Sequence, residues 1–372
     1  MERRANEEEL LLLNTKSKSK SNNELMSPKI KPKPPKSGKG FGSTGSSNSD
    51  NDTIENRIAI EQCKILQRDG VIKISNVLSN ELADELREYV LQQQLIASNV
   101  VEKASSDTVL KVSKSFYGVE NSRTGRCDLQ LSLLNGGYLS DGNENENDDE
   151  SKQNPIQQHT IADTLNALLG SGSGVGTLRH IYENLVTRDG EFYELAAVIT
   201  NPGSKRQQIH PDLPYQDKDG APLYVVFLAL QDITNEMGPT TFLLKTHNSK
   251  SHQIKQFLSN DIEVKNKQLL TIASQDNVKK STLQKGDCVI FDARILHCGN
   301  ANLSKEEGGN TRVLFNFSFR NPTVQGNLGY PGSIRPGYIK KMNLNDMINC
   351  LDKYNNNNND DPFQEYGDGL LH

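Results

Sequence analysis

The sequence predicts a mainly β fold with flanking helices, in which the helices come first and an antiparallel sandwich or barrel follows. Three observations lead to this prediction. After residue 180, short segments rich in Val, Ile, Leu and Phe follow one another, and each is bounded by Gly, Pro, Asn or Asp. Helical segments do not alternate with them, as they would in a parallel α/β sheet. Before residue 180, apolar residues recur instead at helical spacing.

The first part of the chain carries the helix signals. Residues 57–67 show a loose helical pattern that ends at an Asp-Gly pair, and VIKI at 71–74 indicates a short strand. A second helix is expected to begin at a cap formed by Ser79 and Asn80, and a third is expected at 160–169. The apolar stripe of the second helix consists of Leu82, Leu86, Tyr89 and Val90.

The second part of the chain carries the strand signals. Four segments combine β-branched and aromatic residues with turn residues at their ends, which is typical of strands in an antiparallel fold. These segments are YELAAVIT (193–200), PLYVVFLALQ (222–231), DCVIFD (287–292) and RVLFNFSF (312–319).

Polar segments bound and interrupt the predicted domain, which spans 56–345. Residues 1–55 are rich in Lys, Ser, Asn and Pro, and their few apolar side chains cannot offset the entropy of ordering, so a disordered basic tail is expected. Docking of this tail on a membrane surface or an acidic partner is the alternative. Residues 139–154 are acidic and Asn-rich, which predicts an exposed loop inserted in the domain. Residues 346–372 contain an asparagine run and predict a polar, mobile C-terminal region.

Composition and charge narrow the class of protein. Charged residues make up 24% of the chain and the formal net charge is −5, so no nucleic-acid partner is expected. The five cysteines are scattered without Cys-x-x-Cys spacing, which favours free thiols in a reducing compartment. No apolar run has the length of a membrane span, and the N-terminal residues make a poor secretory signal. We therefore expect a cytoplasmic protein, whose oligomeric state the sequence leaves open.

The stretch QQIHPDLPY, residues 207–215, contains the first candidate site residues. In an extended segment His210 and Asp212 point to the same face, with their backbones about 7 Å apart. This spacing fits two metal ligands or a buried His–Asp hydrogen bond, and the pair alone does not decide between them. His297, 87 residues after His210, lies just beyond the strand predicted at 287–292. Two histidines and one carboxylate form the ligand set of non-haem Fe(II) oxygenases, and they leave positions open for a cosubstrate and O₂.

Arg312 is the fourth candidate residue. It opens the strand at 312–319, where alternation places Asn316 and Ser318 on the same face as the arginine. A fixed guanidinium binds a carboxylate through two hydrogen bonds and stays charged, so a keto acid such as 2-oxoglutarate could reach it while chelating the metal. The alternative for Arg312 is a surface ion pair. For Asn316 and Ser318, cosubstrate binding and a purely structural role are equally favoured.

The segment from Gly70 to Asn321 resembles the phytanoyl-CoA dioxygenase family of Fe(II)/2-oxoglutarate oxygenases. An isolated His-x-Asp would be weak evidence, whereas an ordered set of matching segments is specific. The matching segments are DGVIKISNVLSNELADELREYV, HPDLPY, ALQDITNEMGPTTFLLKTH, LQKGDCVIFDARILHCGNANLS and TRVLFNFSF.

The resemblance implies both a fold and an activity. The fold would be a double-stranded β-helix, a jelly-roll of two sheets flanked by helices. The resemblance implies His210, Asp212 and His297 as ligands of Fe(II), with 2-oxoglutarate and O₂ as cosubstrates. It also implies Arg312 as the ion-pair partner of 2-oxoglutarate. The prime substrate would be a small organic molecule, such as an acyl thioester, a lipid or a secondary metabolite. Because Asp212 is present, hydroxylation is favoured over halogenation, which uses the vacancy left by that carboxylate.

Four further residues lie in or beside the matching segments. Gln208 shares a strand face with His210 and could bind a ligand or orient an iron ligand, or could be a polar residue at a sheet edge. Tyr215 could line the substrate pocket, although packing is commoner. His247 is expected to be structural or pocket-lining, and alternation turns Cys298 away from the metal.

Two functions of other classes compete with the oxygenase. One is a non-catalytic binding or sensing module on the same fold, since fold does not fix function. The other is a zinc hydrolase or isomerase that uses the same three ligands. Arg312 and the ordered motifs favour the oxygenase over both.

Overall fold

The structure is a computed structural model that confirms the mainly antiparallel jelly-roll flanked by helices. The acidic insertion predicted at 139–154 lies outside the described residues. The structure describes residues 24–30, 53–103, 125–134, 159–171, 176–215, 220–248, 277–324, 326–329, 332–356 and 361–369.

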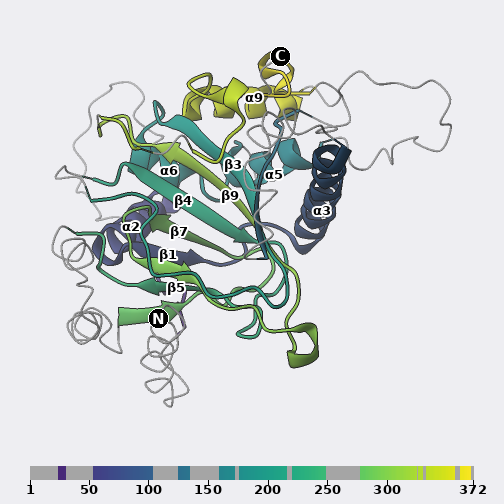
Figure 1. Cartoon of the computed structure of the whole chain (residues 1–372). Helices are drawn as coiled ribbons and strands as arrows, with labels where there is room; N and C mark the ends of the chain where they lie inside the picture. Colours follow the sequence, from purple (N-terminus) through teal and green to yellow (C-terminus); the bar gives the residue numbers. More distant parts are fainter. Residues whose placement is uncertain are drawn as a thin grey trace, which may run out of the picture.

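A large antiparallel sheet crosses the middle of the molecule (Figure 1). It has six strands in the order β1-β7-β4-β9-β3-β2, so strands distant in sequence become neighbours. The long strands β3 and β9 pair along their lengths, with one bulge near the start of β3. The six strands are β1 (Val71–Ile74), β2 (Arg126–Gln130), β3 (Glu191–Thr200), β4 (Leu223–Ala229), β7 (Cys288–Asp292) and β9 (Arg312–Arg320).

A small antiparallel sheet completes the jelly-roll, with strands in the order β6-β5-β8. The segment before His210 extends this sheet, because His210 and His297 exchange two backbone hydrogen bonds of 2.9 and 2.8 Å. From β3 to β9 the chain therefore crosses repeatedly between the two sheets, as a jelly-roll does. The three strands are β5 (Thr240–Leu243), β6 (Val278–Lys280) and β8 (His297–Gly299).

Strand β9 shows how the large sheet divides the apolar core. Its odd-numbered residues, from Val313 to Phe319, pack into the core shared with the helices. Leu314, from the even-numbered set, belongs to a second core, which includes Phe242 from the small sheet. The alternation predicted for this strand is confirmed. The helices cover one face of the sheet, and the other face is turned toward the small sheet.

The helices begin and end where the sequence provides caps. The Thr53 hydroxyl accepts a hydrogen bond from the amide of Asn56 at the start of α2, and Gly70 ends that helix at φ +83°. The Ser79 hydroxyl accepts a bond from the amide of Leu82 at the start of α3, as the predicted cap requires. The helices are α2 (Ile54–Asp69), α3 (Asn80–Lys103), α5 (Thr160–Leu169), α6 (Arg179–Val186) and α9 (Leu344–Asn356). The short 3₁₀ helices are η5 (Lys305–Glu307), η6 (Pro336–Tyr338) and η7 (Gln364–Tyr366).

The predicted domain ends need two corrections. Residue Leu25, placed in the disordered tail, is buried, and its amide bonds the carbonyl of Lys280 on β6. The C-terminal region from 346, predicted to be mobile, begins inside helix α9, which continues to Asn356. Apolar residues recur at helical spacing in α9 and are buried in the core, but the flanking asparagines conceal this pattern in the composition. The buried residues of α9 include Leu344, Met347, Ile348 and Leu351.

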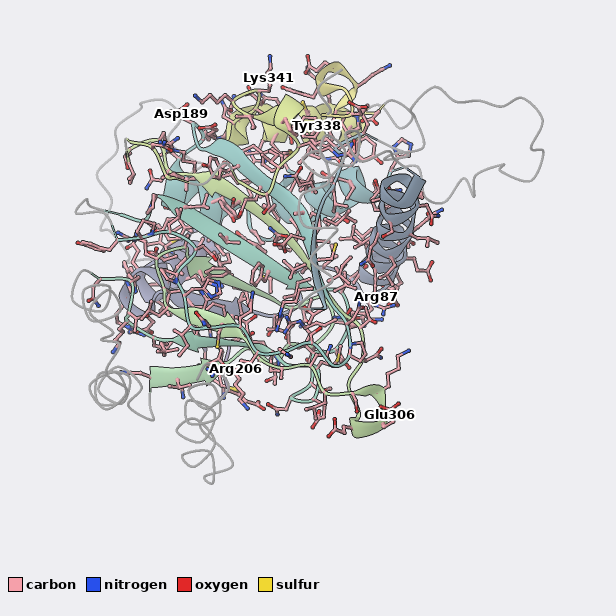
Figure 2. All side chains as sticks on the ribbon, viewed as in Figure 1. Arg87, Asp189, Arg206, Glu306, Tyr338 and Lys341 are labelled. Carbon is pink, nitrogen blue, oxygen red and sulfur yellow. The ribbon has the colours of Figure 1, made fainter. Side chains whose placement is uncertain are left out.

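Figure 2 shows Tyr338 close beneath this C-terminal part of the chain. The Tyr338 hydroxyl donates a 2.8 Å hydrogen bond to the carbonyl of Gly367 and accepts one of 3.0 Å from the amide of Leu133. The C-terminal residues are thereby tied to the segment that follows β2. None of the described helices has the length and apolar character needed to cross a membrane.

Candidate metal centre

His210, Asp212 and His297 converge at one point between the two sheets. His210 and His297 are brought together by their backbone bridge, and their ring centroids lie 4.7 Å apart. The Asp212 Oδ1 atom lies 3.8 Å from His210 Nε2 and 3.5 Å from His297 Nε2. The three donor atoms lie within 4.8 Å of one another, which is the spacing that a shared metal ion requires.

The two imidazoles are held in the same tautomer. His210 Nδ1 lies 2.8 Å from the carbonyl oxygen of Gln208, and His297 Nδ1 lies 3.0 Å from that of Ile295. A carbonyl oxygen only accepts, so each Nδ1 must carry the proton and donate it. Each Nε2 then presents its lone pair toward Asp212. This arrangement prepares both rings to bind a metal through Nε2.

The surroundings of Asp212 disfavour its charge in the absence of a cation. Its side chain keeps 30% of its surface accessible, yet desolvation raises the pKa of the carboxyl group to about 6. His210 acts in the opposite direction and lowers this pKa. A bound divalent cation would stabilise the carboxylate far more strongly than a neutral imidazole does.

These three residues line a cavity of about 280 Å³ between the sheets. Strands β2, β3, β4 and β9 form one wall, and the segment around His210 forms the opposite wall with β5 and β8. Charged side chains of both signs face the interior. The other lining residues are Arg126, Asp128, Glu194, Val198, Gln207, Pro211, Val225, Phe227, Thr240, Gly299, Arg312, Leu314, Asn316 and Ser333.

Arg312 lies in this cavity and is only 1% exposed, so it does not form the surface ion pair considered from the sequence. Its guanidinium donates to the carbonyl of Gly238 and, over 3.1 Å, to the hydroxyl of Thr200. Among the described residues it forms no ion pair, and its Nε has no partner. Burial, together with the charge of Arg126, lowers the pKa of Arg312 to about 9.

Arg126 is a second buried cation at the same end of the cavity. Its Nη1 donates to Thr200 Oγ1 over 3.2 Å, so both guanidiniums use the same hydroxyl as an acceptor. Its Nη2 donates to the carbonyl of Asn300 over 2.8 Å, and no carboxylate in the described part of the chain forms an ion pair with it. Two buried cations around one neutral acceptor form a site for an anion, because an anion would offset the desolvation of both.

The other predicted cosubstrate residues differ in position. Asn316 lines the cavity and is 4% exposed, while Ser318, on the same face of β9, is fully buried but does not line it. Gln208 is exposed, and its contribution is the backbone carbonyl that orients His210. Its neighbour Gln207 enters the cavity instead and accepts a 2.8 Å bond from the amide of Gly299.

The sequence analysis missed Arg126 and Asp128 because it did not identify β2. Within this strand the polar residues Arg126, Asp128 and Gln130 alternate with Cys127 and Leu129, which is the pattern of a half-buried strand. Burial raises the pKa of Asp128 to about 6, and the negative charge of Asp212 adds to this effect. Arg126 opposes it.

Three side chains near the motifs lie outside the cavity. His247 Nε2 donates to the carbonyl of Gln67 near the end of α2, over 3.0 Å, which is a structural role. Cys298 is buried facing away from the candidate metal ligands, and its Sγ lies 3.3 Å from an Nη of Arg206, which Figure 2 shows beside the small sheet. Tyr215 packs under the guanidinium of Arg294, 5.7 Å from its ring centroid.

Comparison with known proteins decides the family. A family model described as phytanoyl-CoA dioxygenase (PhyH) matches residues 66–307, well over half of the 372 residues. The chain belongs to the phytanoyl-CoA dioxygenase family. The match includes all three candidate metal ligands and ends shortly before Arg312. Membership of the phytanoyl-CoA dioxygenase family indicates a 2-oxoglutarate-dependent oxygenase.

Solved structures resemble this phytanoyl-CoA dioxygenase family member at low identity. HygX from Streptomyces hygroscopicus, with nickel and 2-oxoglutarate bound, is 12% identical with a TM-score of 0.43; the match covers 73% of this chain and 94% of HygX. A ThoJ–nickel complex, described as a non-heme monooxygenase, is 13% identical with a TM-score of 0.40; the match covers 71% of this chain and 78% of ThoJ. A search of curated proteins returned no match.

Proposed function

We propose that the protein is an Fe(II)- and 2-oxoglutarate-dependent dioxygenase that hydroxylates a small organic substrate, with release of succinate and CO₂. His210, Asp212 and His297 would hold the iron. Arg312 would bind the distal carboxylate of 2-oxoglutarate. Family membership and the cavity geometry support this proposal.

The donor set fits Fe(II). Two neutral imidazole nitrogens and one carboxylate oxygen occupy one side of a metal and leave its other positions to small ligands. Bound iron would supply the activation of O₂, which no side chain in the cavity can perform. The protein's own residues supply the tautomers and the orientation, through the Gln208 and Ile295 carbonyls that fix the two rings.

Arg312 and Arg126 would orient the cosubstrate. At their shared end of the cavity, the Nε of each guanidinium lacks a hydrogen-bond partner among the described residues. This end therefore has more unpaired donors than the rest of the described cavity wall. A carboxylate placed there accepts charge-assisted hydrogen bonds and offsets the desolvation of both cations. Gln207 bonds the amide of Gly299 and so fixes the backbone that follows His297.

One observation matters most for this proposal. A His/Asp/His cluster and a buried guanidinium without an anionic partner lie in the same cavity. A hydrolase that used the three ligands with zinc would have no need of Arg312. A structural role for Arg312 would predict a carboxylate beside it, and the described residues provide none.

Succinate formation tests the proposal. The purified metal-free protein is supplied with 2-oxoglutarate under air, with and without Fe(II), and succinate is measured; a slow turnover without prime substrate is expected. Asp212→Ala should abolish it while circular dichroism stays unchanged, because the ligand is lost and the core is not. His180→Ala, which removes an imidazole of α6 outside the cavity, is the matched control. Iron-dependent succinate from Asp212→Ala, without added chloride or carboxylate, would contradict the assignment of the ligands.

A further inference from the structure

Charged side chains are unevenly distributed along the cavity wall formed by β2, β3 and β9. Arg126, Thr200 and Arg312 occupy matching positions on these three strands and form the cationic end. Asn316 lies four residues along β9 from Arg312, about 13 Å away at the backbone. Acceptors follow beyond the cationic end: Asp128 lies level with Leu314, and Glu194 lies level with Ser318.

The acceptors come from three strands. Asp128 of β2 and Glu194 of β3 both line the cavity, and Glu194 is 5% exposed. Asn316 is 4% exposed, and its Oδ1 has no hydrogen-bond partner among the described residues. An amide oxygen that is buried without a partner costs free energy unless a donor arrives from elsewhere. The Asn316 oxygen therefore points to a ligand group that carries N–H or O–H donors.

Two carboxylates, Asp128 and Glu194, line the same wall. A buried carboxylate is stabilised most by a donor that carries a positive charge, so protonated amines fit this wall better than neutral hydroxyls.

We propose that the prime substrate is a small hydrophilic molecule bearing protonated amines, which Asp128 and Glu194 bind at separate points of the wall, with Asn316 accepting a further hydrogen bond. This inference rests on the proposed function and names the substrate class for the same site. An acyl thioester or lipid fits poorly, because an alkyl chain would desolvate both carboxylates without pairing them. The phosphates of an acyl thioester of coenzyme A would also be repelled by them.

The test measures binding with 1,4-diaminobutane as the probe, 1,4-butanediol as its neutral counterpart and octanoyl-CoA as the acyl thioester. Each is titrated calorimetrically, without oxygen, into the full-length protein loaded with Fe(II) and 2-oxoglutarate. The visible charge-transfer band of the Fe(II)–2-oxoglutarate complex is recorded first for every variant. The variants are Asp128→Asn and Glu194→Gln, which preserve side-chain shape, and Glu306→Gln, which changes an exposed carboxylate far from the cavity.

We expect the diamine to bind at least about tenfold more tightly than the diol, since removing a charged hydrogen-bond partner usually has an effect of this size. Asp128→Asn and Glu194→Gln should each weaken diamine binding about tenfold, while Glu194→Gln keeps the charge-transfer band and an affinity for 2-oxoglutarate within about threefold of wild type. Glu306→Gln should bind the diamine like wild type.

Three results would overturn the inference while leaving the oxygenase proposal intact, provided that the band is present. These are equal binding of diol and diamine, unchanged diamine binding in both amide variants, and tighter binding of octanoyl-CoA than of the diamine. Absence of the band in wild-type protein would overturn the proposed function itself, and the substrate class with it.

Discussion

Replacing Arg312 with methionine is expected to stabilise the ligand-free protein while abolishing binding of 2-oxoglutarate. The guanidinium is 1% exposed, and burial beside Arg126 lowers its pKa from 12.5 to about 9. At about 1.4 kcal/mol per pKa unit, this shift corresponds to roughly 5 kcal/mol of unfavourable burial as an upper limit. The variant also leaves the carbonyl of Gly238 without its donor, which costs about 1–3 kcal/mol. A net gain of at most about 2–4 kcal/mol in the free energy of unfolding remains.

Thermal unfolding of the metal-loaded protein measures both effects. The ligand-free variant should unfold a few degrees above wild type, at roughly 2–4 °C per kcal/mol. In wild type, 2-oxoglutarate at 100 times its Kd should add about 2.7 kcal/mol, whereas the variant should gain nothing. Arg335→Met changes another fully buried arginine, outside the cavity, and should retain the response to 2-oxoglutarate. The reasoning is refuted if Arg312→Met destabilises the ligand-free protein by several kcal/mol or keeps the 2-oxoglutarate response.

Three further perturbations test other parts of the structure. In metal-free protein, the pKa of Asp128 is raised, so the folded state keeps a proton that the unfolded state has released. The free energy of unfolding should therefore fall as pH rises from about 4 to above 6. Denaturant titrations of Asp128→Asn should show this pH dependence reduced by up to about 3 kcal/mol. Gly299→Ala should weaken 2-oxoglutarate binding, measured calorimetrically, because a Cβ would lie 2.7 Å from Gln207 Oε1 and 2.8 Å from Arg126 Nη1; unchanged affinity would contradict the close packing of these groups. Leu351→Ala in α9 should cost about 2–4 kcal/mol of unfolding free energy, whereas a detached C-terminal region would show no effect.

The residues that sequence reasoning placed correctly are those fixed by local periodicity. Strand β9 is buried on both faces, yet Phe315 and Phe317 separate cleanly from Arg312 and Asn316, because side chains alternate along any extended strand. The three candidate metal ligands could be grouped because residue type, order and spacing acted together. Their convergence depends on the bridge between the segment at 210 and β8, which no local pattern encodes.

The misplaced residues share a different cause. Gln208 was assigned by extending strand alternation back from His210, but the chain before His210 forms an isolated bridge and not a regular strand, so Gln207 enters the cavity. Arg126 and Asp128 lie on a five-residue strand with only two apolar residues, Cys127 and Leu129, so its pattern is too weak to indicate a strand without its partner β3. The predictions of cytoplasmic location and of no nucleic-acid partner stay predictions.

The most direct test of the central claim is titration of 2-oxoglutarate into the Fe(II)-loaded protein in the absence of oxygen, followed by visible absorption. The account predicts a charge-transfer band that saturates in wild type and is lost in Asp212→Ala because the metal is lost. In Arg312→Met the band should be absent at the 2-oxoglutarate concentration that saturates wild type, because the anchor is lost. A wild-type protein that binds Fe(II) but shows no band at saturating 2-oxoglutarate would contradict the account and favour a non-catalytic binding module on the same fold.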